Sequence, residues 1–203
     1  MHLVCLDLEG VLVPEVWINV AERTGIDALR ATTRDISDYD VLMRQRLSLL
    51  DEHGLTLSDI QAVISDMGPL PGACAFLESL RARGPVVILS DTYCEFAEPL
   101  MRQLDWPTLF CHRLEVDDAD RVTGYRLRMR DHKRAAVVAF RDLNFATIAV
   151  GDSYNDTTML AEADHGILFH APANVIDEFP QFPSLSGFDE LAAAIRDLDA
   201  GMA

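Results

Sequence analysis

Two short segments, far apart in the chain, each place acidic side chains directly after an apolar run. The first ends in Asp7 and Glu9, and the second in Asp152, Asn155 and Asp156. If the two apolar runs are neighbouring strands of a parallel sheet, their carboxyl ends lie at one edge and bring these side chains together. Clustered carboxylates repel one another, and hard oxygen ligands beside a phosphate favour Mg²⁺. The pattern therefore predicts Mg²⁺-dependent phosphoryl transfer.

Two further polar residues between these segments have the chemistry to bind a phosphoryl group. Ser90 follows the apolar run 86–89, and Lys133 opens a predicted helix. A hydroxyl and backbone N–H groups near a helix start donate to phosphate oxygens, and an ammonium group neutralises their charge. Each residue also has a purely structural interpretation, Ser90 as a helix cap and Lys133 as an exposed helix-start lysine.

The elements that must position these residues alternate along most of the chain. Apolar runs predict strands at 3–8, 86–89, 109–111, 146–150 and 166–169, and helical spacing predicts helices near 72–82, 93–104, 133–141, 155–162 and 188–198. This alternation is typical of a parallel α/β sheet flanked by helices. Residues 113–128 surround an acidic turn and predict a β-hairpin, which would cover the sheet edge or form a homodimer contact.

An all-helical block follows the first strand. From Pro14 to about residue 67 there is no strand signal, and three helices are expected: one ending at Gly25, one stopped by Gly54 and one capped by Ser58. The block ends at the Gly-Pro-Leu-Pro-Gly segment 68–72. We therefore predict a Rossmann-like α/β core domain, residues 1–13 and 69–203, and a helical cap or lid inserted into it, residues 14–68.

Composition limits the partners. The chain has 203 residues and a net charge of −16, so nucleic acid and anionic membranes are poor partner candidates. No apolar run approaches the roughly 20 residues of a membrane-spanning helix, and the start of the chain does not resemble a signal peptide. The four cysteines lack CxxC spacing and are expected to be reduced thiols. We expect a cytoplasmic protein that acts on small molecules.

In order and type, the four groups of polar residues resemble the motifs of the haloacid-dehalogenase-like (HAD) phosphatases. The segment GDSYND, with a serine and a lysine before it in the chain, is the most specific part of this resemblance. Pro14-Glu15 and the segment MRQRLSLL, residues 43–50, resemble the substrate-reading segments of the phosphoserine phosphatases. The segments DLEGVLVPE and GILFHAP are similar to the branch described as phosphoserine phosphatase with phosphoserine:homoserine phosphotransferase activity.

The resemblance implies a role for each acid. Asp7 would be the nucleophile that forms an aspartyl-phosphate, and its carboxylate would also bind Mg²⁺. Glu9 would be the general acid/base, with its backbone carbonyl on Mg²⁺. Asp152 would bind Mg²⁺ directly, and Asp156 directly or through a metal-bound water. Most of the superfamily has Asp where this chain has Glu9, which is one methylene longer.

The resemblance also implies a substrate-binding set. Ser90, the backbone N–H groups of Asp91 and Thr92, Lys133 and Asn155 would contact the phosphoryl group. The phosphoserine phosphatase pattern has glycines where this chain has Asp91 and Thr92, which puts two side chains beside the pocket.

Glu15 and Arg46 would read the amino acid, since a carboxylate suits its ammonium group and a guanidinium suits its carboxylate. Alternatively, these two residues form a salt bridge that ties the lid to the core. Arg44 lies two residues from Arg46, so only one of the two arginines is expected to point inward.

These residues together predict a phosphatase for O-phospho-L-serine, with homoserine as a second acceptor of the phosphoryl group. Three alternatives stay open. The substrate could be another small phosphate monoester. The chain could instead be a receiver-type signalling domain, which also uses acids and a lysine around a phospho-aspartate, or a non-catalytic binding relative of the phosphatases.

Overall fold

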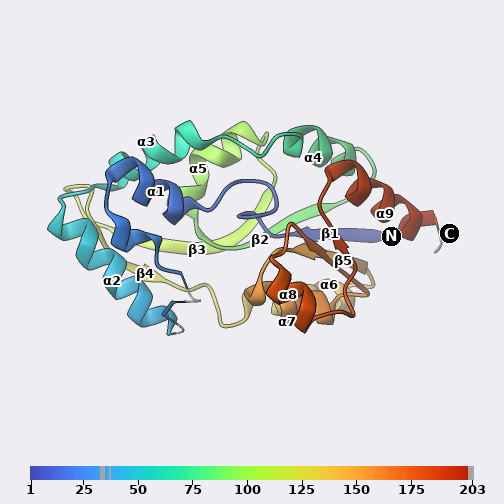
Figure 1. Ribbon diagram of the computed structural model, residues 1–203. Coiled ribbons are helices and arrows are strands. Elements are labelled where there is room, and N and C mark those ends of the chain that lie inside the picture. Colours follow the sequence, from blue (N-terminus) through green and yellow to red (C-terminus); the bar gives the residue numbers. More distant parts are fainter. Residues whose placement is uncertain (33–34, 37, 201–203) are drawn as a thin grey trace.

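The computed structural model describes residues 1–32, 35–36 and 38–200, and its centre is a sheet (Figure 1). Within these residues the sheet has seven strands in the order β4-β3-β2-β1-β5-β6-β7. All neighbouring strands are parallel except the β3–β4 pair. The strands are β1 (His2–Leu6), β2 (Val86–Tyr93), β3 (Thr108–Val116), β4 (Val122–Arg126), β5 (Ala146–Gly151), β6 (His165–Phe169) and β7 (Ser184–Leu185).

Helices cover both faces of this sheet (Figure 1). Val4 and Leu6 of β1 belong to the apolar cluster that includes helices α4 (Ala73–Arg81), α5 (Cys94–Gln103) and α9 (Phe188–Ala200). Leu3 and Cys5 belong to the opposite cluster, with α6 (His132–Asp142), α7 (Thr157–Glu162) and α8 (Ala173–Glu178). The central strands are apolar on both faces because both are covered. The predicted α/β architecture is confirmed.

The strand β2 differs from its prediction. β2 continues to Tyr93 instead of ending at residue 89, and its pairing with β3 shifts register between Leu89 and Tyr93. Ser90, Asp91 and Thr92 therefore lie inside an irregular strand end. The expected hairpin at 113–128 is confirmed as the antiparallel β3–β4 pair.

Between β1 and α4 lie three described α-helices, α1 (Val16–Thr24), α2 (Tyr39–Glu52) and α3 (Leu57–Met67), and a short 3₁₀ helix, η1 (Asp27–Arg30). α3 packs against α1 and α5, and α2 packs against β4. The cap of α3 is Thr56, and the prediction of Ser58 is wrong. Thr56 and Asp59 form a reciprocal capping box that satisfies backbone N–H groups at both residues.

In the part of the chain that the structure describes, no helix combines the length and the apolarity that crossing a bilayer would take.

Candidate active site

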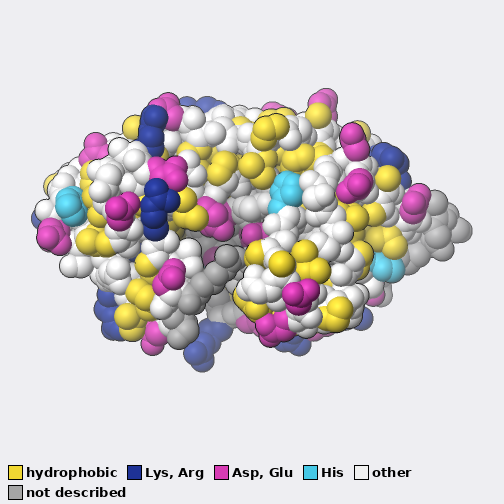
Figure 2. All heavy atoms as spheres, in the orientation of Figure 1, with side chains coloured by type: hydrophobic (Ala, Val, Ile, Leu, Met, Phe, Trp, Pro, Cys, Tyr) yellow, Lys and Arg dark blue, Asp and Glu magenta, His cyan; other side chains and the backbone are white. Residues whose placement is uncertain are grey.

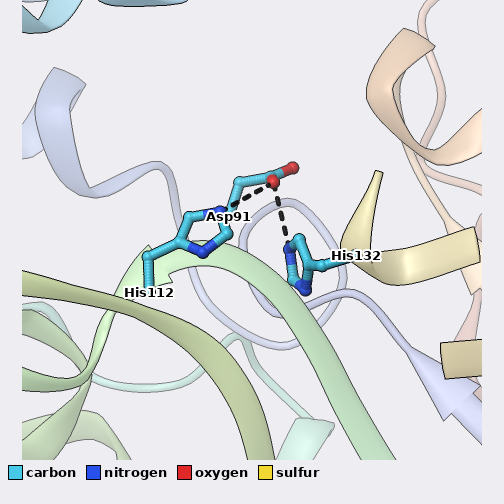
Figure 3. A group of neighbouring side chains, drawn as sticks. All are labelled: Asp91, His112 and His132. Carbon is cyan, nitrogen blue, oxygen red and sulfur yellow. Dashed lines mark hydrogen bonds and ion pairs between the residues drawn. The ribbon is translucent and has the colours of Figure 1, made fainter. Parts of the chain in front are cut away.

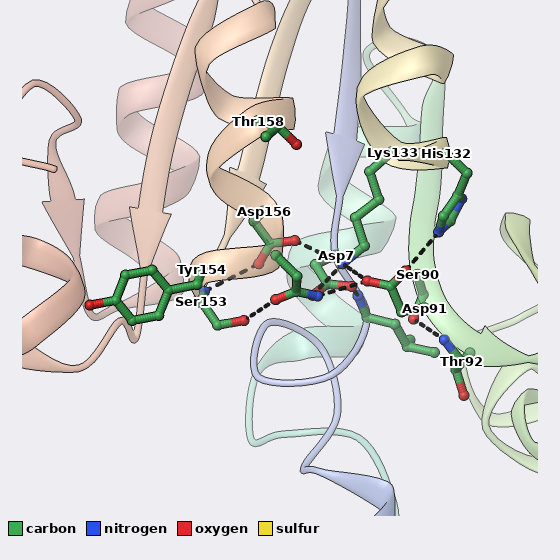
Figure 4. Close-up of polar contacts among 12 residues, drawn as sticks. Asp7, Ser90, Asp91, Thr92, His132, Lys133, Ser153, Tyr154, Asp156 and Thr158 are labelled. Atoms are coloured by element: carbon green, nitrogen blue, oxygen red, sulfur yellow. Dashed lines mark hydrogen bonds and ion pairs between the residues drawn. The ribbon is translucent and has the colours of Figure 1, made fainter. Parts of the chain in front are cut away.

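The candidate site lies where β2, β1 and β5 end side by side (Figure 4). Leu6 of β1 is in register with Ile88 on one side and Val150 on the other. Asp7 follows Leu6 directly, and its backbone N–H donates to the Val150 carbonyl over 2.9 Å. Because the strands are parallel, Ser90 and Asp152 reach the same edge as Asp7. On this face of the molecule, Figure 2 shows a hollow between α1–α2 and α8, with acidic side chains at its margin.

Three buried carboxylates form the centre of this edge. Asp7, Asp152 and Asp156 each offer one oxygen, and these oxygens all lie within 4.8 Å of one another. Burial and the neighbouring acids raise the pKa of Asp7 well above its usual value and the pKa of Asp152 to about 7. A divalent cation would offset this repulsion, and the donors are the hard oxygens that Mg²⁺ prefers. The residues present therefore fit the expected Mg²⁺.

The turn after β1 packs tightly against these carboxylates. Gly10 has a φ of +78°, and a Cβ built on it would lie 2.4 Å from Cγ of Asp152. The side-chain carboxylate of Glu9 accepts a hydrogen bond from the backbone N–H of Val16 over 2.8 Å. Burial, followed by the charge of Glu15, raises the pKa of Glu9 to about 7. The carboxyl group therefore exchanges its proton near neutral pH.

Asp156 is fixed by its own loop. Its Oδ2 accepts from the backbone N–H groups of Asp152 and Ser153, at 3.0 and 3.2 Å. Gly151 leaves room for this side chain, because a Cβ there would lie 2.4 Å from Asp156. Oδ1 of Asp156 accepts from Lys133 over 2.8 Å. Both oxygens of this carboxylate thus already have a donor.

Lys133 is buried among three carboxylates, so its interpretation as an exposed helix-start lysine is wrong. Its Nζ lies 2.8 Å from Asp156, 3.1 Å from Asp7 and 3.2 Å from Asp91. Burial lowers the pKa of Lys133, but the three carboxylates outweigh burial and hold the pKa well above its usual value. The ammonium group therefore stays charged next to the expected nucleophile.

The β2 end contributes Ser90, Asp91 and Thr92. Ser90 is buried within the strand and Tyr93 is the N-cap of α5, so Ser90 is not a helix-capping residue. The backbone N–H of Thr92 donates to the Ser90 hydroxyl over 3.2 Å. The Thr92 N–H thus points at Ser90 here, and phosphate would have to compete for it.

Asn155, on the 3₁₀ turn η2 (Tyr154–Asp156), also reaches the β2 end. Its Nδ2 donates to Asp91 over 2.7 Å. The side chains of Asp91 and Asn155, which come from distant segments of the chain, therefore touch each other.

The expected amino-acid readers lie on the helical block, Glu15 at the start of α1 and Arg46 within α2. Arg46 is buried, its guanidinium stacks 4.5 Å over the Trp17 ring, and Nη2 donates to the Ala31 carbonyl. Its Nε is buried without a hydrogen-bond partner within the described residues. Glu15 is exposed at the start of α1, and no ion pair joins it to Arg46 in the described part of the chain. Arg44 is exposed, so Arg46 is the arginine that points inward.

Sequence reasoning missed two residues at this site, His112 and His132. Both are buried and lie against the Asp91 carboxylate. His112 carries no motif, and the only signal for His132 is its position next to Lys133.

Comparison with known proteins agrees with this arrangement. Residues 13–161 match the haloacid dehalogenase-like hydrolase family. The chain is 66% identical over 191 residues to the phosphoserine phosphatase ThrH of Pseudomonas aeruginosa. The aligned region covers 94% of this chain and 93% of that protein. It is 67% identical over 191 residues to a phosphoserine phosphatase of Pseudomonas syringae pv. tomato, covering 94% and 81%.

The fold is also similar to that of a phosphoserine phosphatase crystal structure in apo form. The TM-score is 0.71 at 22% identity, over 87% of this chain and 90% of that one. The chain therefore belongs to the haloacid dehalogenase-like hydrolases and, within them, to the phosphoserine phosphatase family.

Proposed function

We propose that the protein is a Mg²⁺-dependent phosphoserine phosphatase that works through an aspartyl-phosphate on Asp7. The observation that carries this proposal is the contact between Asp7 and Lys133 at 3.1 Å, inside a group of buried acids that fits a divalent cation. The names of the two Pseudomonas relatives support the substrate. A receiver-type domain is not favoured, because the family match covers residues 13–161.

The first step forms the covalent intermediate. An Asp7 carboxylate oxygen attacks phosphorus, the bond from phosphorus to the serine oxygen breaks, and Glu9 gives its proton to that oxygen. Leu8 donates its backbone N–H to Oδ1 of Asp7 over 2.7 Å, so the carboxylate is held in one orientation. Lys133 and Ser90 would contact the phosphoryl oxygens and offset their charge.

The second step releases the phosphoryl group. Glu9, now a carboxylate, takes a proton from water, whose oxygen attacks phosphorus while the bond to Asp7 breaks. A pKa near 7 suits a group that must both give and take a proton near neutral pH. If the hydroxyl of homoserine replaces water, the same steps give phosphohomoserine.

The metal would be held by the Asp7 carboxylate, the Glu9 backbone carbonyl and Asp152, with Asp156 acting through a bound water. Both Asp156 oxygens already accept hydrogen bonds from the protein, which favours the contact through water. Mg²⁺ supplies positive charge that stabilises the ionised nucleophile and the transferred phosphoryl group.

Arg46 and Glu15 would bind the amino-acid part of the substrate. The buried guanidinium of Arg46 has a free Nε that a carboxylate can satisfy. Glu15, exposed at the start of α1, would take the ammonium group. Residues 14–68 would form the lid over this pocket, so the lid decides whether water or an alcohol reaches the intermediate.

The test is product analysis with purified protein, Mg²⁺ and O-phospho-L-serine, with and without homoserine. Free phosphate in both samples, absent for Asp7→Asn, supports the phosphatase. Phosphohomoserine formed at the expense of phosphate supports the transferase as well. If neither product forms, the proposed substrate is wrong.

A second variant tests the role of Glu9 in choosing the acceptor. Glu9→Asp moves the base by one methylene and should shift the ratio of transfer to hydrolysis. A changed total rate with an unchanged ratio would contradict this role.

A further inference from the structure

Asp91 is an ionised side chain whose carboxylate is surrounded by hydrogen-bond donors. His132 Nε2 lies 3.1 Å and His112 Nε2 3.5 Å from Oδ1, as Figure 3 shows. Asn155 and Lys133 contact Oδ2 at 2.7 and 3.2 Å. Burial raises the pKa of Asp91, but Lys133, the two histidines and Asn155 outweigh burial and hold the pKa well below its usual value. The carboxylate is therefore anionic and held from two sides.

The hydrogen bonds around the two rings fix which nitrogen carries the proton. Nδ1 of His112 accepts from the backbone N–H of Arg128 over 3.1 Å, so its proton must sit on Nε2, facing Asp91. Nδ1 of His132 is buried without a partner in the described residues. A buried N–H without an acceptor is unfavourable, so the His132 proton also belongs on Nε2, facing Asp91. Both rings thus direct an N–H towards one oxygen, His132 within hydrogen-bond distance and His112 at the longer distance of 3.5 Å.

A metal ion is the alternative occupant of this cluster. Asp91, His112 and His132 each offer a ligand atom, and these atoms lie within 4.8 Å of one another. A metal would need the Nε2 lone pair of His112, but the hydrogen bond from Arg128 leaves a proton on that nitrogen. The geometry therefore favours a pair of hydrogen-bond donors over a metal site.

The other oxygen of Asp91 faces the site. Lys133 has three N–H donors and three carboxylate neighbours, so Asp91 and Asp156 together direct the third donor towards Asp7. Asn155 is held at both ends, because its Oδ1 accepts from the Ser153 hydroxyl while its Nδ2 donates to Asp91. Figure 4 shows Asp91 between Lys133 and His132.

We propose that Asp91, held by His112 and His132, is a positioning residue that aims the Lys133 ammonium and the Asn155 amide at the phosphoryl group on Asp7. The inference rests on the proposed phosphoryl transfer. It assigns a task to a side chain that stands where the phosphoserine phosphatase pattern has glycine. An extra anion beside the phosphate weakens ground-state binding, so its benefit must appear in kcat.

The test compares Asp91→Asn, which keeps the shape and removes the charge, with two variants of His132. His132→Gln keeps an N–H donor near the Nε2 position, and His132→Leu removes it. We expect kcat for Asp91→Asn to fall about 10- to 100-fold with KM unchanged or lower. His132→Leu should lower kcat about 10-fold, and His132→Gln should recover most of that loss.

Three results would overturn the proposal. Equal loss of kcat in the Gln and Leu variants would make His132 a packing residue. A raised KM with unchanged kcat for Asp91→Asn would make Asp91 a simple binding residue. Stoichiometric Zn²⁺ binding to the wild type that is lost in His132→Leu would make the cluster a metal site.

A different substrate distinguishes failure of this proposal from failure of the proposed phosphoserine activity. If the wild type turns over p-nitrophenyl phosphate but not phosphoserine, the variants are compared on p-nitrophenyl phosphate and the positioning role is still tested. If it turns over neither, the ¹⁵N resonances of the imidazoles decide. Nε2–H tautomers at His112 and His132 that change in Asp91→Asn support the proposed contacts of the two rings with Asp91. Nδ1–H tautomers refute them.

Discussion

Replacing Gly10 by alanine should damage the metal site more than the fold. A Cβ at Gly10 would lie 2.4 Å from Cγ of Asp152, whereas ordinary contact begins near 3.4 Å. Asp152 or the turn must therefore move by about 1 Å. A misplacement of this size in an active site can lower the rate about 100-fold, which corresponds to about 2.7 kcal/mol of transition-state stabilisation.

Gly25 provides a matched control for backbone strain. It caps α1 with a φ of +73°, close to the +78° of Gly10, and a Cβ there would meet nothing within 4 Å. Alanine in this left-handed conformation costs roughly 1–2 kcal/mol at either position. Both variants should therefore lose similar stability from backbone strain, and only Gly10→Ala should lose activity.

The assay is phosphate release from O-phospho-L-serine over a range of Mg²⁺ concentrations, with urea unfolding of each variant. For Gly10→Ala we expect kcat/KM to fall about 100-fold and the Mg²⁺ concentration for half-maximal activity to rise. For Gly25→Ala we expect near-normal kinetics. Equal activity of the two variants at equal stability would refute the reasoning, since the contact with Asp152 would then be irrelevant.

Three further predictions concern charge, pH and capping. Lys133→Met leaves the buried carboxylates of Asp7 and Asp156 and the partly exposed carboxylate of Asp91 without their cation. This change should destabilise the Mg²⁺-free protein by about 3–5 kcal/mol in urea unfolding, with added Mg²⁺ restoring part of the loss. Burial raises the pKa of Asp152 to about 7, so protons compete with Mg²⁺ for this carboxylate below that pH. The Mg²⁺ concentration for half-maximal activity should therefore rise on acidification and level off above pH 7. A flat profile between pH 5.5 and 8 would contradict this. Thr56→Ala removes the capping box of α3 and should cost about 1 kcal/mol of stability. Thr56→Ser should retain the capping box. Equal melting temperatures of the two variants would show that the cap contributes nothing.

Local sequence signals were enough for much of the architecture. Strands such as 146–150 are short apolar runs with acids at their ends, and both features depend only on neighbouring residues. The cap of α3 also has a local signal, because Asp59 three residues after Thr56 is typical of a capping box, although the hydroxyl of Ser58 is a competing cap in the sequence. The two-residue strand β7 was not predicted, because it is too short for a periodic signal.

Contacts between distant segments were decided by the tertiary structure. The sequence placed a lysine at position 133, but only the packing of α6 against the sheet showed it buried among three carboxylates. The two histidines around Asp91 come from β3 and the start of α6, and neither has a spacing that marks it. The physical reason is that alternation and capping arise from neighbouring residues, whereas hydrogen bonds and charge pairs require side chains that only the folded sheet brings together.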